Sequence, residues 1–156
     1  MQGETVMENV RIYEITEAAE SLLTPLNALL SQLSSTPRNF TLDDLAAIVQ
    51  SPNSRLFVVE VDGVVGGMLT LGDYLAPTGR KMWIEDVVVD EAMRGRSLGR
   101  LLVEHAIDCA RSNGPASLML TSRPSRVAAN ALYRACGFAF KETNNYRIEI
   151  PAKGQD

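Results

Sequence analysis

A strand pattern, a helix pattern and a second strand pattern follow one another between residues 82 and 121, and this succession constrains the fold most. The run Met82–Val89 is apolar and rich in β-branched residues, as in a buried strand. Apolar residues at helical spacing predict a helix over Leu98–Arg111, which the Asn-Gly-Pro triplet at 113–115 would end. The run Ser117–Thr121 predicts the next strand. Because a strand–helix–strand crossover joins parallel strands, this unit predicts a mixed sheet.

The other segments complete a set of helices and strands. Apolar runs on both sides of Asp62 and Gly63 predict a β-hairpin, and Thr41 with Asp44 forms a capping-box pattern at the start of a helix. The predicted strands cover 10–15, 56–61, 64–71, 82–89, 117–121, 138–141 and 146–150, and the predicted helices 22–33, 42–50, 98–111 and 127–135. The predicted fold is therefore α/β, a mixed, twisted sheet with helices on both faces, in the order β-α-α-β-β-β-α-β-α-β-β.

The length and composition fit one globular domain. The chain has 156 residues, of which 46% are hydrophobic and 22% charged, and a chain of this length can bury a single core. We therefore predict one domain over 1–156, with its core at about 8–150. No apolar run approaches the roughly 20 residues that cross a bilayer, and the first residues lack a signal-peptide pattern. These features predict a cytoplasmic protein without a membrane partner.

The net charge and the reactive residue types exclude several classes of function. A net charge of −4 argues against a non-specific nucleic-acid binder, which needs a basic excess. Cys109 and Cys136 fit neither a metal motif nor a CxxC redox motif, and the single histidine, His105, excludes a multi-histidine metal site. We therefore predict no metal cofactor, and two reduced cysteines without a nucleophilic role.

The turn that leads into the helix 98–111 has the features of an anion site. A helix that starts directly after a tight turn presents free backbone N–H groups and the positive end of its dipole, and phosphate is the usual ligand. Glycines let the backbone approach such a ligand closely, and arginines add positive charge. The turn supplies both kinds of residue: Arg94, Gly95, Arg96, Gly99 and Arg100. An arginine-rich surface connector is the alternative at this point, since the Walker sequence is absent.

Two segments resemble the signature sequences of the GNAT superfamily of acetyl-CoA-dependent N-acetyltransferases. The sequence Arg94-Gly-Arg-Ser-Leu-Gly99 resembles the family's (Gln/Arg)-x-x-Gly-x-(Gly/Ala) motif, and Asn130–Phe138 resembles its fourth-helix segment, which ends in Gly-Phe. The order of the predicted elements also agrees with that fold. The chain departs from the family pattern at Ser97, where glycine is usual, and at Arg126, where many members have asparagine.

The resemblance implies a site for acetyl-CoA as co-substrate. Its pyrophosphate would lie on the backbone N–H groups of the turn, and its pantetheine arm along the preceding strand. A bulge near Asp86–Val88 and a splay from the strand at 117–121 would open the cleft. The N–H of Val87 would stabilise the oxyanion of the thioester carbonyl. The implied cofactor-binding residues are Val87, Val88, Val89, Arg94, Gly95, Arg96, Ser97, Leu98, Gly99, Arg100, Asn130 and Tyr133.

The resemblance also implies the catalytic residues. Tyr133 matches the tyrosine that protonates the departing thiolate. Glu85 lies in a segment similar to the corresponding strand of glucosamine-6-phosphate N-acetyltransferases, and it is the first candidate for the base that deprotonates the amine. Asp86, and a mechanism that uses neither carboxylate, stay open as alternatives. Regular strand alternation places Glu85 and Asp86 on opposite faces, although a bulge could exchange the faces.

These features together predict an N-acetyltransferase that moves the acetyl group of acetyl-CoA to a primary amine by direct attack. We expect the acceptor to be a small molecule, shaped by connections at 33–42, 71–82 and 142–146. An acetyltransferase for protein N-termini or lysine side chains is the alternative. A non-catalytic CoA-binding sensor or interaction protein is the alternative from another class. A homodimer is common in the resembled family and is compatible with this prediction.

Overall fold

The computed structural model describes residues 8–36 and 38–154, and its centre is a mixed sheet. The strands of these residues lie in the order β1-β2-β3-β4-β5. Neighbours from β1 to β4 are antiparallel, whereas β4 and β5 are parallel, which confirms the predicted crossover. The strands are β1 (Val10–Glu14), β2 (Ser54–Val61), β3 (Val64–Ala76), β4 (Gly79–Val89) and β5 (Ser117–Met119).

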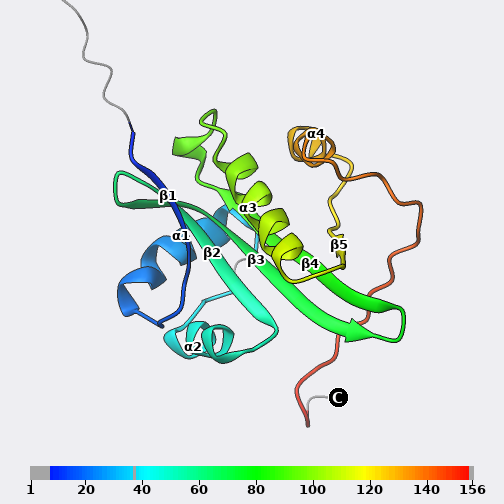
Figure 1. Cartoon of the computed structure of the whole chain (residues 1–156). Helices are drawn as coiled ribbons and strands as arrows, with labels where there is room; N and C mark the ends of the chain where they lie inside the picture. The colour runs from blue at the N-terminus through cyan, green and yellow to red at the C-terminus, as the bar shows by residue number, and fades with distance from the viewer. Residues whose placement is uncertain (1–7, 37, 155–156) are drawn as a thin grey trace, which may run out of the picture.

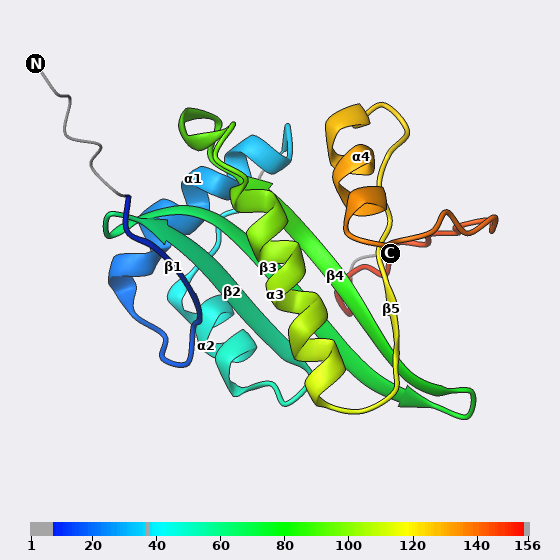
Figure 2. The ribbon, with the colours of Figure 1, turned by 45° about the horizontal axis from the view of Figure 1, so that its top comes forward.

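Helices cover both faces of this sheet, as predicted (Figures 1 and 2). The helices are α1 (Leu23–Leu33), α2 (Leu42–Gln50), α3 (Leu98–Ser112) and α4 (Val127–Ala135), with short 3-10 helices at Glu20–Leu22 and Glu91–Met93. α1 and α2 pack on one face, and α3 crosses the other, with α4 beside it. The alternation of β2 supplies both cores, because Phe57 points toward α3 and Val58 toward α1 and α2.

Local sequence patterns explain the start of α2 and the turn between β2 and β3. The N–H of Asp44 donates to the Thr41 hydroxyl at 3.2 Å, and the Asp44 carboxylate accepts from the Thr41 N–H at 2.9 Å, which confirms the predicted capping box of α2. The β2–β3 hairpin turns at Asp62 and Gly63, whose φ angles are 50° and 81°. Two successive left-handed residues are what a two-residue hairpin turn requires.

The predicted pair of strands at the C-terminal end is wrong. The structure has no strand between residues 138 and 154, and it leaves Phe140, Tyr146, Ile148 and Ile150 between 81% and 91% exposed. The alternation of apolar residues at 146, 148 and 150 is a period-two pattern, but a strand also needs a hydrogen-bonding neighbour. β5, the edge strand on this side, offers only three residues.

The predicted loop at 71–82 is also wrong, because β3 and β4 continue through most of it. Their ladder extends to the pair Ala76 and Gly79. The hairpin therefore projects beyond β2, whose pairing with β3 ends at Ser54 and Gly72 (Figure 2). Side chains of this region consequently have fixed positions on a sheet face rather than in a loop.

Candidate active site

A bulge interrupts β4 where the sequence analysis expected one. Thr70 pairs with Glu85, and Met68 pairs with Val88, so two residues of β4, Asp86 and Val87, together face Leu69. Asp86 has a φ of 51°, in the left-handed region that aspartate tolerates better than most residues. An extra residue in one strand bends that strand and re-aims its side chains.

The bulge places Glu85 and Asp86 on the same face of the sheet, although regular alternation predicts opposite faces. Glu85 lies opposite Thr70 in the ladder, and Asp86 lines a cavity together with Thr70 on the face covered by α1 and α2. Val87 and Val89 instead pack against the core beside α3. Two neighbouring carboxylates are therefore available on one side of β4.

The environment of Glu85 suits a base. Partial burial and, second, the negative charge of Asp86 raise the pKa of the Glu85 carboxyl. A carboxylate with a raised pKa holds an abstracted proton more strongly, which brings it closer to the range that general base catalysis requires. This direction of the shift supports Glu85 as a candidate base.

The edge of β4 beyond β5 is open, as the implied splay requires. The ladder between the two strands covers only Lys81–Trp83 on β4, so the rest of β4 has no strand partner on this side among the described residues. On the opposite edge, the N–H of Asp90 donates to the carbonyl oxygen of Gly66 at 2.8 Å. Because N–H groups alternate along a regular strand, that of Val89 points away from β3 toward the open edge, and Val87 lies next to it in the bulge.

The turn before α3 leaves the start of this helix free to bind an anion. Gly95 and Ser97 have φ angles of 82° and 58°, and the side chain of Ser97 makes no capping hydrogen bond. At α2, by contrast, the hydroxyl of the N-cap residue Thr41 accepts from the N–H of Asp44. The first N–H groups of α3 therefore keep the electrostatic character of a phosphate site. The left-handed φ also explains why glycine is usual at the position of Ser97.

The arginines of this turn lie at the surface. Arg96 pairs with Glu8 at 2.8 Å, Arg100 with Glu104 at 2.7 Å, and Arg94 with Glu91 at 3.9 Å. Exposed ion pairs of this kind are weak, so a phosphate can replace the acidic partner at small cost. The turn, the uncapped helix and the open edge of β4 thus fit the pyrophosphate and the pantetheine arm of CoA.

Gly99 lies where α3 meets α4 and β4, and its predicted role in the approach of a ligand stays a prediction. A Cβ atom at this position would lie 3.4 Å from Cδ2 of Leu132 and 3.7 Å from Cγ2 of Val89. These are ordinary van der Waals distances, so the packing of α3 against α4 and β4 would also accept an alanine here. Gly95, where a Cβ would meet nothing within 4 Å, is the glycine of the turn that is open to a ligand.

We expect the conformation of Ser97 to control CoA affinity. Ser97→Val places a β-branched residue in the left-handed region, where even an ordinary residue costs roughly 1–2 kcal/mol. The variant should bind CoA at least about tenfold more weakly in a calorimetric titration, whereas Ser97→Gly should bind at least as well as the parent. A folded Ser97→Val protein with parental affinity would show that this turn does not hold the cofactor.

Tyr133 lies on α4 and is 6% exposed, with its ring edge-on to Phe138 at a centroid distance of 6.2 Å. Burial raises the pKa of its phenol, and the positive charge of Arg126 opposes this effect. The phenol therefore remains protonated at neutral pH, as a proton donor must.

Asn130 has a structural role that the sequence did not indicate. Its side-chain N–H groups donate to the carbonyl oxygens of Arg123 and Arg126 at 2.9 and 2.8 Å, which ties the loop after β5 to α4. Only its side-chain oxygen stays available for the predicted contact with the cofactor arm.

In the loop after β5, the Ser122 hydroxyl is buried without a hydrogen-bond partner among the described residues. No sequence pattern distinguishes this serine from a solvated one.

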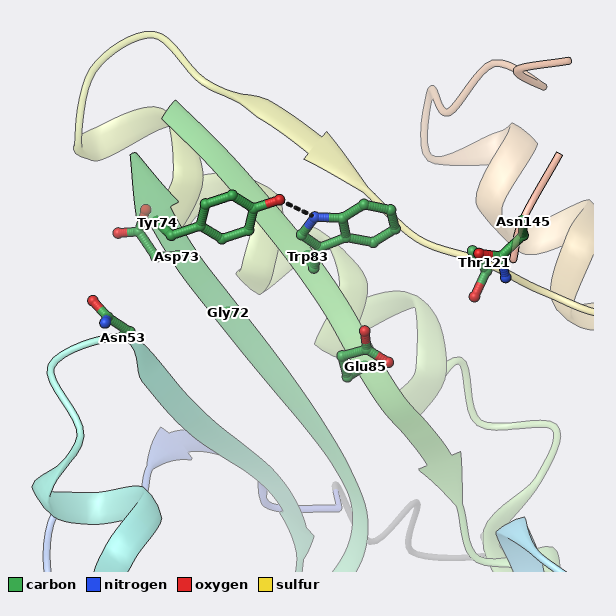
Figure 3. A pocket seen from close by; sticks show the side chains of 8 residues that line it. All are labelled: Asn53, Gly72, Asp73, Tyr74, Trp83, Glu85, Thr121 and Asn145. Atoms are coloured by element: carbon green, nitrogen blue, oxygen red, sulfur yellow. Dashed lines mark hydrogen bonds between the residues drawn. The ribbon is translucent and has the colours of Figure 1, made fainter. Parts of the chain in front are cut away.

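A groove of about 630 Å³ lies beside Glu85 (Figure 3). Figure 3 shows Trp83 and Glu85 on the same face of β4, with Thr121 and Asn145 across from them. The indole N–H of Trp83 donates to the hydroxyl of Tyr74 at 3.4 Å. Residues from the expected connections at 71–82 and 142–146 thus do meet at one site. The lining residues are Asn53, Gly72, Asp73, Tyr74, Trp83, Glu85, Thr121 and Asn145.

Three further facts about the described residues concern possible metal ligands, helix hydropathy and the two cysteines. Residues 8–36 and 38–154 bring no three His, Cys, Asp or Glu side chains together in a metal-binding group. None of the helices in this part of the chain combines the length and hydropathy of a membrane span. Both cysteines are half-buried free thiols, and burial raises the pKa of Cys136, which disfavours a nucleophilic thiolate.

The sequence of this chain is similar to those of known acetyltransferases. The Acetyltransferase (GNAT) family matches residues 18–138. Glucosamine 6-phosphate N-acetyltransferase 1 from Oryza sativa is 28% identical over 147 residues, which are 89% of this chain and 86% of that protein. Streptothricin acetyltransferase from Streptomyces lavendulae is 35% identical over 92 residues, 58% of this chain. This match spans only 48% of the Streptomyces protein.

The name of a third relative indicates that its acceptor is a protein. The [ribosomal protein bS18]-alanine N-acetyltransferase from Salmonella typhimurium is 43% identical over 53 residues, 34% of this chain and 36% of that protein.

Solved structures share the same fold. Glucosamine-6-phosphate N-acetyltransferase from Arabidopsis thaliana superposes with a TM-score of 0.76 and 23% identity, over 90% of this chain and 98% of that chain. The aminoglycoside N-acetyltransferase AAC(6')-Iy, solved with CoA, gives a TM-score of 0.72 and 17% identity, over 92% and 96% of the two chains.

Proposed function

We propose that this chain, which belongs to the acetyltransferase (GNAT) family and is an acyltransferase, transfers the acetyl group of acetyl-CoA to a small primary amine. The observation that carries this proposal is the pair of carboxylates, Glu85 and Asp86, which the bulge brings to one face of β4. The open strand edge with the N–H of Val87 lies at the same bulge.

The co-substrate has a continuous set of partners on this chain. The backbone N–H groups from Arg94 to Arg100 would bind the pyrophosphate of acetyl-CoA, and the edge of β4 at 87–89 would bind the pantetheine arm as an added strand does. The N–H of Val87 would then donate to the thioester carbonyl. Asn130 would offer its side-chain oxygen to the arm.

The reaction requires the acceptor nitrogen to lose two protons and the thiolate to gain one. The acceptor enters as an ammonium ion, and Glu85 takes a proton from it, directly or through water. The free amine attacks the thioester carbon, while the N–H of Val87 stabilises the negative charge on the carbonyl oxygen. The C–S bond then breaks, Tyr133 gives its proton to the departing thiolate, and the nitrogen loses its second proton to the resulting Tyr133 phenolate, directly or through water. The products are the N-acetylated amine and CoA.

One assay distinguishes the proposed function from two others, namely acetylation of a protein N-terminus and CoA binding without catalysis. The relative that acts on a ribosomal protein favours a protein N-terminus as the second candidate acceptor. A non-catalytic CoA-binding protein is the candidate from another class.

The assay follows free thiol from acetyl-CoA with a panel of small amines and peptides. We expect amine-dependent thiol release with at least one small amine. Release only with peptides would support the protein acceptor. CoA binding in a titration, without release for any acceptor, would contradict an enzymatic function.

A further inference from the structure

A second cavity, of about 400 Å³, lies between α1, α2 and the sheet, on the face to which the bulge directs Asp86. Its size is that of a site for a small molecule. Most of its wall is apolar and comes from the two helices, the connection between them, and β2 and β3. These apolar residues are Leu26, Leu30, Phe40, Ala47, Ile48, Leu56 and Met68.

Three charged residues line this cavity, and two of them form an ion pair with each other. Arg38 and Asp44 also line it, but they pair with each other at 3.1 Å, and the Arg38 side chain is 82% exposed. Asp44 is further held by the cap of α2. Asp86 belongs to no ion pair among the described residues. The cavity is therefore an apolar space with one unpaired carboxylate in its wall.

This carboxylate lies next to the proposed reaction centre. Asp86 precedes Val87, the proposed oxyanion donor, and follows Glu85, the proposed base. An ammonium group that pairs with Asp86 would therefore lie one residue along β4 from each of them. The remainder of the same molecule would extend away from β4, between α1 and α2.

We propose that the acceptor is a primary amine at one end of an apolar alkyl or aryl body, with its ammonium group at Asp86 and its body in the cavity between α1 and α2. The inference rests on the proposed acetyl transfer and specifies its substrate class. A phosphorylated amino sugar fits this cavity poorly. The wall offers it one arginine, which already has a carboxylate partner, and the free charge is negative.

The first test compares four amines as acceptors: phenethylamine, hexylamine, ethanolamine and glucosamine 6-phosphate. Thiol release from acetyl-CoA gives kcat/KM for each amine with the parent protein. We expect the two apolar amines to exceed ethanolamine by at least about tenfold, since each buried methylene contributes a factor of about 10 or more in a fitted pocket. Glucosamine 6-phosphate should be the poorest acceptor.

The second test fills the cavity. Ala47 is an exposed residue of α2 that lines the cavity, so Ala47→Trp adds bulk there without changing the buried core. We expect KM for phenethylamine to rise at least about tenfold, with little change for ethanolamine or for CoA binding. Ala28→Trp, at an exposed position of α1 that does not line the cavity, is the matched control and should resemble the parent.

The outcomes separate this inference from the proposed function. A preference for glucosamine 6-phosphate or ethanolamine, or a parental KM for phenethylamine in Ala47→Trp, would overturn the apolar acceptor but leave acetyl transfer standing. No thiol release with any amine, while CoA still binds, would overturn both.

Discussion

Replacing Tyr133 with phenylalanine should lower turnover by at least about tenfold, because general acid catalysis contributes about 10²–10⁴-fold and water can partly replace the phenol. The substitution removes only the oxygen, so the packing of the ring against Phe138 should remain. The loss should shrink with an acyl donor whose thiol is more acidic, since its thiolate needs less protonation. Turnover with acetyl-CoA and with that donor would be measured under conditions where chemistry limits the rate.

Tyr13→Phe is the matched control. Tyr13 lies on β1, at the far edge of the sheet from β5, and its hydroxyl donates to Glu60 at 2.6 Å. This variant loses a hydroxyl outside the site and should keep parental turnover. A folded Tyr133→Phe protein with parental turnover would leave Tyr133 with a packing role only.

Glu85→Gln should produce a second large loss of turnover, again of at least about tenfold, with CoA affinity little changed. The acidic limb of the pH profile carries the specific prediction. The raised pKa of Glu85 means that the carboxylate is present above this pKa and is protonated as the pH falls through it. Activity should therefore fall on the acidic side at a higher pH than an ordinary glutamate would give, and Glu85→Gln should lose this limb.

Asp86→Asn tests the cause of that shift. Asparagine has a similar size and tolerates the left-handed backbone, but it removes the negative charge that helps to raise the pKa of Glu85. The acidic limb of kcat should move to lower pH in this variant. If the acidic limb of the pH profile of kcat is unchanged in both Glu85→Gln and Asp86→Asn, Glu85 is not the base. Water then accepts the proton, or the acceptor reaches the site already deprotonated.

The sequence was most informative where one local pattern determines one local structure. The glycine- and arginine-containing turn does lead from β4 into α3, and the capping box of α2 and the turn at Asp62 and Gly63 have the predicted geometry. The bulge was expected, and so was the possibility that it exchanges the faces, but the sequence does not indicate which residue leaves the regular alternation. One left-handed residue, Asp86, brings the second carboxylate to the face of Glu85.

Features that depend on distant neighbours could not be predicted in this way. The alternation at residues 146–150 indicates a strand, but it does not show whether a partner edge is present. The cavity between α1 and α2 combines residues from Leu26 to Asp86, and no spacing along the chain marks them as one wall. The hydrogen bonds of Asn130 to the loop after β5 are equally invisible in a helix pattern.

The most direct test of the proposed function measures both products of one reaction, CoA and the N-acetylated amine, from acetyl-CoA and phenethylamine. Thiol release and mass spectrometry would follow the two products in the same sample, with a sample without amine as the reference. We expect equal amounts of both products, at a rate that depends on the amine and falls in Glu85→Gln. CoA release at the same rate without the amine, or release without the acetylated amine, would contradict direct acetyl transfer.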